Sequence, residues 1–129
     1  FLKDNGYEAI NFGADTTEPC DYPDIAIRIG EAVASGEIDR GILVCGTGIG
    51  ISIAANKVRG VRAALCFTEE SARLTREHND TNVLVLAGRD SKAEDPMRIV
   101  DIWLNTAFSG DERHVRRIKK ISDYESGKK

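Results

Sequence analysis

The sequence lacks the features of a membrane-spanning, nucleic-acid-binding or disulfide-stapled protein. No apolar run approaches the roughly 20 residues that a membrane span needs. The formal net charge of −3 and the pI near 5.4 give no global attraction to nucleic acid or to an anionic membrane. Cys20, Cys45 and Cys66 are an odd number of cysteines at wide spacing. This pattern fits a reduced, cytoplasmic protein better than a disulfide scaffold.

Metal-ligating patterns, internal repeats, low-complexity tracts and linkers are also missing. The 2 histidines and the scattered cysteines have no metal-ligand spacing, which argues against zinc. With 129 residues and 41% hydrophobic content, the chain is long enough to bury a core without staples. The sequence therefore predicts one compact domain over residues 1–129.

Apolar segments alternate along the chain between strand-like and helix-like patterns. We expect strands at 7–12, 41–45, 61–66 and 82–87. Helices are expected from a cap at Asp24 to Gly36, at 51–57, from Thr68 to about His78, after Asp95-Pro96, and at about 111–124. Strands that alternate with helices indicate parallel βαβ units. The expected fold is a three-layer α/β/α, Rossmann-like domain, with ligands bound beyond the carboxyl ends of its strands.

The segment Cys45-Gly46-Thr47-Gly48-Ile49-Gly50 connects a buried strand to a small-residue helix. Backbone N–H groups at such a helix start favour an anion, and the same field favours a thiolate at Cys45. The segment does not match a Walker loop, a dinucleotide fingerprint or a cysteine phosphatase loop, because position 51 is isoleucine and one residue separates the last two glycines. A simpler interpretation, a strand-to-helix turn with a buried inert thiol, stays equally open from the loop alone.

Four more side chains are candidates for binding or catalysis. His78 lies in the polar run His-Asn-Asp-Thr-Asn before a strand, although a capped helix end explains that run about as well. Arg89 follows the last strand, where phosphate is often held, but solvated loop arginines are equally common. Arg113 and Arg117 are four residues apart on one helix face and could grip one phosphate together. The simpler interpretation of their basic run is a solvent-exposed helix face.

Taken together, these segments resemble the ribose-5-phosphate isomerase B family, within the wider group that includes galactose-6-phosphate isomerase subunits. The resemblance covers essentially the whole chain. It is carried by Asp21-Tyr22-Pro23, by the stretch from Gly41 to Lys57, by His78-Asn79-Asp80-Thr81-Asn82, and by Gly110 to Arg117. The family implies interconversion of ribose 5-phosphate and ribulose 5-phosphate through a cis-enediolate, in the non-oxidative branch of the pentose phosphate pathway. It implies no metal and no organic cofactor.

The resemblance also implies a role for each candidate residue. Cys45 would be the base that carries the proton, Thr47 would assist proton movement between the two oxygens, and His78 would open the sugar ring. Backbone N–H groups would form the anion hole, at Gly46, Thr47, Gly48, Ile49 and Gly50. The remaining residues would bind substrate: Asp21, Tyr22 and Asn79 at the sugar, and Arg89, Arg113 and Arg117 at the phosphate. The family further implies a homodimer or homotetramer with shared active sites, in which the basic helix at 111–124 contributes across the interface.

Departures from the pattern define the subtype. One subgroup replaces the cysteine and uses a glutamate at the place of Ile51, so this chain resembles the cysteine-base type. Galactose-6-phosphate relatives tend to lack the His-Asn-Asp-Thr-Asn run, which favours the pentose substrate here. A galactose-6-phosphate or allose-6-phosphate isomerase subunit stays an alternative, as does a catalytically silent sugar-phosphate-binding subunit. A thiol redox or nucleotide-binding module is weaker, since the chain has no Cys-x-x-Cys.

The first residues give a further expectation. Phe1 to Gly6 read as the last turn of a helix that ends in a glycine cap, with no preceding strand. We expect the family's first strand, with its Asp-His pair, to be absent from the chain as written. On that expectation, the chain as written folds poorly and isomerises little.

Overall fold

The computed structural model describes residues 21–88 and 92–127. The expected strand at 7–12 and the expectations for the first residues lie outside this part of the chain. The described elements are, in order, α1 (Tyr22–Ala34), β1 (Gly41–Cys45), α2 (Ile49–Asn56), β2 (Ala63–Leu65), α3 (Glu69–Asn79), β3 (Val83–Ala87), α4 (Pro96–Asn105) and α5 (Glu112–Glu125).

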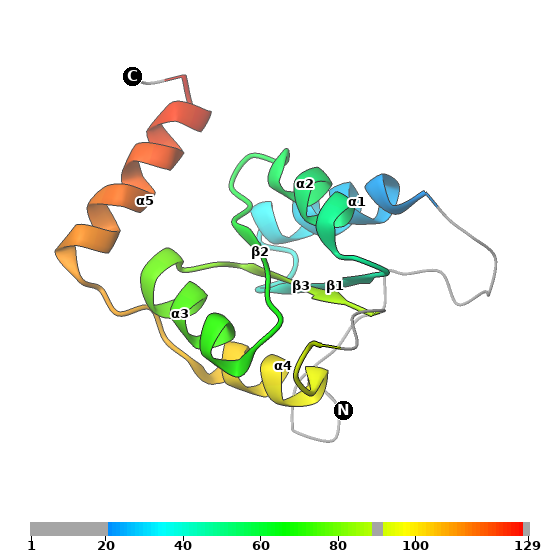
Figure 1. Cartoon of the computed structure of the whole chain (residues 1–129). Coiled ribbons are helices and arrows are strands. Elements are labelled where there is room, and N and C mark those ends of the chain that lie inside the picture. Colours follow the sequence, from blue (N-terminus) through cyan, green and yellow to red (C-terminus); the bar gives the residue numbers. More distant parts are fainter. Residues whose placement is uncertain (1–20, 89–91, 128–129) are drawn as a thin grey trace.

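The described strands form one parallel sheet in the order β1-β3-β2. Helices α1 and α2 cover one face of this sheet and α3 and α4 cover the other (Figure 1). The expected α/β class with a parallel sheet and three layers is therefore confirmed. Strand β3 lies centrally, and its register with β1 runs from Gly41 beside Val83 to Cys45 beside Ala87.

Each face of the sheet carries its own apolar core, and β3 supplies both. Val83 and Val85 belong to the cluster beneath α1 and α2, whereas Leu84 and Leu86 belong to the cluster beneath α3 and α4. This division follows from the alternation of side chains along a strand. It explains why the apolar run in β3 is uninterrupted: a strand covered on both faces has no solvent side.

The helix starts are set by local chemistry, with one correction to the sequence prediction. Asp95 caps α4 as expected, since its carboxylate accepts a hydrogen bond from the Met97 N–H at 3.0 Å. By contrast, α1 begins at Tyr22 with Asp21 in the cap position, not at the predicted cap Asp24. Pro23 falls in the first turn, where its missing N–H has no intrahelical partner to lose, so the helix can begin before it.

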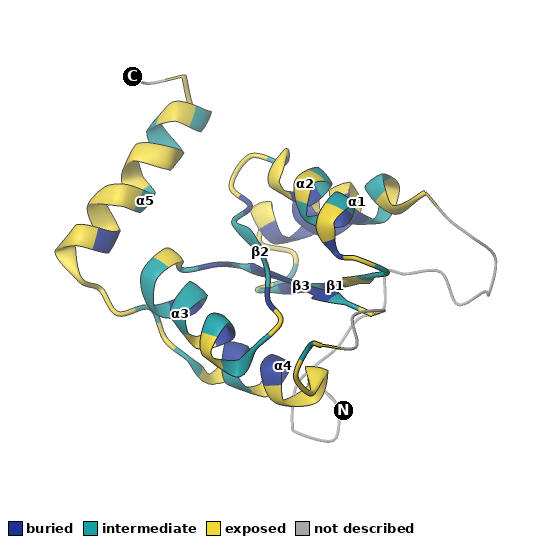
Figure 2. Cartoon of the chain, viewed as in Figure 1, coloured by how far each residue is buried: buried dark blue, intermediate teal, exposed yellow. Residues whose placement is uncertain are grey.

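Helix α5 extends away from the body of the domain (Figure 2). Its only buried residue is His114, near its start. Near its other end, Glu125 accepts a hydrogen bond from the Gly60 N–H at 3.3 Å. Among the described residues, no helix is both long and apolar enough to cross a membrane.

Candidate active site

The loop after β1 is built around a glycine in a left-handed conformation. Gly48 has φ 77° and is the N-cap residue of α2. A Cβ atom at this position would overlap the Leu65 side chain on β2. Glycine is therefore required at position 48 for two reasons, namely its backbone conformation and the close approach of the loop to the sheet. This requirement explains the glycine-rich sequence at the end of β1.

Side-chain hydroxyls hold the loop in shape. The Thr47 hydroxyl accepts a hydrogen bond from the Ile49 N–H at 3.2 Å, and the Ser52 hydroxyl donates to the Ile49 carbonyl at 2.8 Å. The Ser52 N–H donates to the Gly48 carbonyl at 3.2 Å, which closes the first turn of α2. First-turn N–H groups of a helix have no intrahelical acceptors, so this end of α2 favours negative charge.

Cys45 lies at the carboxyl end of β1, directly before the loop. It is half-buried, and its carbonyl accepts a hydrogen bond from the Gly88 N–H at 2.7 Å, which ties it to the end of β3. Cys66 differs, because it is 2% exposed and burial raises the pKa of its thiol. Of these two cysteines, Cys45 beside the glycine-rich loop is the less buried one, and partial exposure is what a reactive cysteine requires. Cys20 lies outside the described residues.

Tyr22 adjoins the same loop from α1. It is exposed, and a Cβ atom built on Gly50 would lie 2.5 Å from its hydroxyl oxygen. The tyrosine ring therefore occupies the space that a larger residue at position 50 would need. Asp21 precedes it and is also exposed. The structure thus brings together eight of the predicted residues at one edge of the sheet, namely Asp21, Tyr22, Cys45, Gly46, Thr47, Gly48, Ile49 and Gly50.

His78 and Asn79 lie at the opposite edge of the sheet, where the strands begin. They end α3, and the residues that lead into β3 follow shortly after them. Between Gly41 and Cys45 the sheet advances about 13 Å at roughly 3.3 Å per residue. Cys45 and His78 are therefore separated by at least the length of the strands within one chain. The structure does not bring the proposed base and the proposed ring-opening residue together.

His78 instead stacks on His114 of α5. Their ring centroids are 4.3 Å apart with an interplanar angle of 22°, and Arg113 Nη2 lies 3.4 Å from His114 Nε2. Burial of the ring lowers the pKa of His114, and its electrostatic interactions with His78 and then with Arg113 lower it further. The Asp111 carboxylate acts in the opposite direction. Protonation of His114 is therefore disfavoured.

The remaining predicted residues divide between this second edge and the undescribed segment. Arg113 and Arg117 are exposed on α5, one turn apart, so they lie with His78 and Asn79 and not with Cys45. Arg89 lies outside the described residues. Sequence reasoning placed His114 only within a basic run and missed its stack with His78. The one available signal was that the chain has just 2 histidines, each beside predicted binding residues.

Comparison with known proteins decides the family. The family model described as Ribose/Galactose Isomerase matches residues 1–121. The chain belongs to the ribose/galactose isomerase family. It is 48% identical over 124 residues to the ribose-5-phosphate isomerase B of Escherichia coli, covering 96% of this chain and 83% of that protein.

Solved structures and a second relative show the range of the family. The structure of Clostridium thermocellum ribose-5-phosphate isomerase B superposes with a TM-score of 0.93 at 52% identity, covering 98% of this chain and 84% of that one. The galactose-6-phosphate isomerase subunit LacB of Clostridium acetobutylicum is 36% identical over 123 residues, covering 95% of this chain and 71% of that protein. The family therefore contains isomerases named for pentose and for hexose phosphates.

Proposed function

We propose that this chain is a cytoplasmic ribose-5-phosphate isomerase that interconverts ribose 5-phosphate and ribulose 5-phosphate with Cys45 as the base. The observation that carries the proposal is the position of Cys45, which is half-buried at the carboxyl end of β1 and comes shortly before a helix start that favours negative charge. The family and the names of its closely similar members support the same reaction.

In this mechanism the Cys45 thiolate takes the proton from C2 of the open-chain aldose. The C–H electrons form the C1–C2 double bond and the carbonyl electrons move onto O1, which gives the cis-enediolate. The Thr47 hydroxyl then passes the O2 proton to O1, and Cys45 returns its proton to C1 as the C2 carbonyl forms. Backbone N–H groups of residues 46–50 stabilise the negative oxygen, because they are already oriented before charge develops. Asp21 and Tyr22 bind the sugar from the same edge.

Ring opening and phosphate binding belong to the other edge of the molecule in this proposal. His78 opens the ring, Asn79 binds a sugar hydroxyl, and Arg113 and Arg117 bind the phosphate together with Arg89. Since the described members of this set lie at least a strand's length from Cys45 in one chain, a complete site takes Cys45 from one protomer and His78 from another. We infer a homodimer, or a homotetramer built from it, with α5 at the shared interface.

Substitution of the two described cysteines tests the base. We expect Cys45→Ala to lose isomerisation of ribose 5-phosphate while still binding it, because only the proton carrier is removed. Cys66→Ala is the matched control, since its thiol is buried against the core beneath α3 and α4, and it should keep its activity. Steady-state turnover and substrate binding measured by calorimetry distinguish the outcomes. Normal turnover by Cys45→Ala would show that the base is wrong, and binding without turnover by the unaltered chain would favour a silent binding subunit.

Mixing two inactive variants tests the shared site. If each site combines residues from two protomers, Cys45→Ala and His78→Asn should recover activity when refolded together, because a mixed dimer has one site with both residues intact. At random pairing, about a quarter of all sites are restored. No recovery from a mixture shown to contain mixed dimers would mean that each chain forms its own site.

Comparing kcat/KM for ribose 5-phosphate and for galactose and allose 6-phosphates separates the pentose activity from the hexose alternatives, which the relative named LacB keeps open.

A further inference from the structure

The turn between α3 and β3 has an unusual backbone. Asp80 has φ 45° and ψ 49° and is the single non-glycine residue with positive φ in the described part of the chain. Glycine is the common residue at such a helix end, whereas aspartate and asparagine are among the few other residues that tolerate it. An aspartate in this position suggests that its carboxylate is used.

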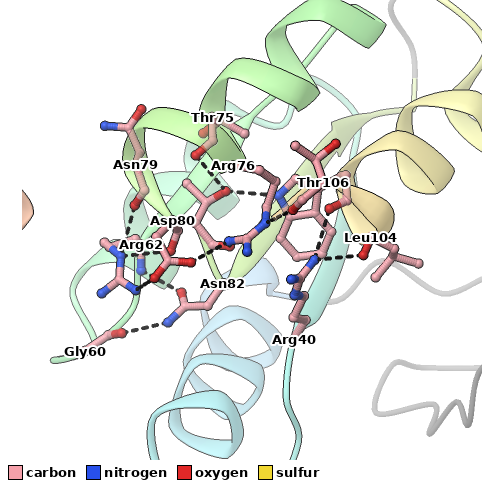
Figure 3. Close-up of polar contacts among 12 residues, drawn as sticks. Arg40, Gly60, Arg62, Thr75, Arg76, Asn79, Asp80, Asn82, Leu104 and Thr106 are labelled. Atoms are coloured by element: carbon pink, nitrogen blue, oxygen red, sulfur yellow. Dashed lines mark hydrogen bonds and ion pairs between the residues drawn. The ribbon is translucent and has the colours of Figure 1, made fainter. Parts of the chain in front are cut away.

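Arg76 binds that carboxylate from inside the protein. Its side chain is 6% exposed, and its Nη1 donates to Asp80 Oδ1 at 2.8 Å and to the Thr81 carbonyl at 2.7 Å. Its Nε donates to the carbonyl of Thr106, beyond the end of α4, at 3.0 Å. Buried arginines occur where such partners neutralise and saturate them. Arg76 therefore ties the turn to both α3 and the segment after α4 (Figure 3).

Arg62 holds the same turn from the other side. Its Nε donates to the carbonyls of Asn79 at 3.2 Å and Asp80 at 3.0 Å, and its Nη2 lies 3.6 Å from Asp80 Oδ2. Asn82 fixes Arg62 in turn, because its Oδ1 accepts the Arg62 backbone N–H at 2.7 Å. Two guanidinium groups thus hold the carbonyl oxygens of residues 79, 80 and 81.

The side chains proposed to meet substrate lie on the outside of this arrangement. The Asn79 carbonyl points toward Arg62, while its side-chain amide points away from the cluster (Figure 3). Asn79 is exposed, and His78 comes directly before it. The polar network contacts the backbone on which these two residues are mounted. A shift of the turn would therefore move both side chains together.

We propose that Arg76 and Asp80 are positioning residues, which hold the end of α3 so that His78 and Asn79 face the substrate in a fixed orientation. The proposal rests on the proposed function, in which His78 opens the sugar ring. Proton transfer requires hydrogen-bond distance, so a displacement of about 1 Å can lower the rate by about 10²-fold. The polar run from 78 to 82 thus combines two substrate-facing residues with the aspartate that orients them.

Three variants separate positioning from simple stability. Asp80→Gly removes the carboxylate and keeps a residue that tolerates positive φ. Asp80→Asn keeps both the turn and an oxygen that can accept from Arg76, so it should restore function. Glu70→Ala is the control, because it removes another carboxylate of α3 that pairs with an arginine, Arg73 at 3.7 Å, but near the start of the helix and away from the turn.

The first measurement does not depend on activity. The chain has 2 histidines, so its NMR spectrum contains two histidine ring Cε1–H signals. We expect Asp80→Gly to shift the His78 signal, while Asp80→Asn and Glu70→Ala leave both signals in place. Unchanged signals in Asp80→Gly would overturn the proposal. Because this measurement needs no turnover, it tests the positioning role even if the unaltered chain does not isomerise ribose 5-phosphate.

The second measurement compares two reactions of the assembled enzyme. Ribulose 5-phosphate is open-chain, since its C5 oxygen carries the phosphate, so exchange of its C1 proton with solvent needs no ring chemistry. We expect Asp80→Gly to lower ribose 5-phosphate isomerisation at least about tenfold more than this exchange. An equal fall in both rates would indicate a merely structural role and overturn the proposal. If Asp80→Gly does not fold, Arg76→Lys replaces it in the same two measurements with the same expected results, because lysine keeps the charge but loses the forked donor geometry.

Discussion

Replacing Thr81 by valine tests the buried hydrogen bond that joins the turn after α3 to Trp103 of α4. The indole Nε1 of Trp103 donates to the Thr81 hydroxyl at 2.9 Å. Trp103 is fully buried and Thr81 is 3% exposed. Valine has nearly the shape of threonine, so the substitution opens no cavity but leaves the indole N–H without its acceptor. An unsatisfied buried donor costs about 1–3 kcal/mol, and we expect the free energy of unfolding to fall by that amount.

Urea unfolding is the assay, followed by circular dichroism and by fluorescence at one protomer concentration for all variants. Trp103 is the only tryptophan of the chain, so the emission reports this site alone. Thr75→Val makes the same change in α3 and serves as the control. It keeps the contact with Thr81, because Thr75 accepts hydrogen bonds from Thr81 with its backbone carbonyl. We expect that control to change stability much less.

A double-mutant cycle identifies the cause. In a Trp103→Phe background the donor is already gone, so Thr81→Val should cost less there than in the unaltered chain. A loss of less than about 0.5 kcal/mol on Thr81→Val, which is the scatter of ordinary surface substitutions, would refute the assignment of stability to this hydrogen bond. An equal cost in both backgrounds would refute it as well.

Two further predictions concern the glycine loop and the histidine stack. Gly48→Ala should lower the free energy of unfolding by more than the roughly 1–2 kcal/mol that a left-handed alanine costs, since its Cβ would also overlap Leu65. The control in thermal unfolding is Gly36→Ala, because Gly36 has φ 84° but open space around it. Equal losses of stability in the two variants would contradict the overlap. Because the pKa of His114 is lowered on folding, the unfolded chain binds more protons below the ordinary histidine pKa of about 6.5. Stability should fall as pH drops through this region, and His114→Gln should flatten the urea-midpoint profile; an unaltered slope would exclude the stack as its source.

Local chemistry made the strands and helix starts predictable. The run Gly41 to Cys45 is apolar throughout and forms a strand, as its pattern indicates, but the described residues do not cover both of its faces, since Val44 is 60% exposed. The pair Asp95-Pro96 is enough to predict the start of α4, because the carboxylate acceptor of Asp95 and the fixed φ of Pro96 are both local properties. The predicted start of α1 was wrong because local chemistry allowed two starts. Asp21 and Asp24 are both acceptable caps, and Pro23 fits either the first turn of a helix or the position just before one.

Contacts between distant segments could not be predicted in this way. Arg76 is buried only because Asp80, Thr81 and Thr106 converge on it, and Thr106 is 30 residues away in sequence. A single arginine in a charged helix gives no sign of this burial. The stack of His78 on His114 likewise depends on where α5 leaves the domain, which periodicity does not report.

The separation of the candidate site into two halves, however, follows from the order of elements. In a parallel sheet, a residue that follows a strand lies at the carboxyl edge, and a residue that ends the next helix has returned to the amino edge. Cys45 ends β1 and His78 lies near the end of α3, so the order of elements alone assigns them to opposite edges. The reaction proposed above uses both residues, and they are therefore proposed to come from two protomers. The same rule places the glycine-rich loop after β1 with the cysteine, and the pair formed by Arg76 and Asp80 with the histidine.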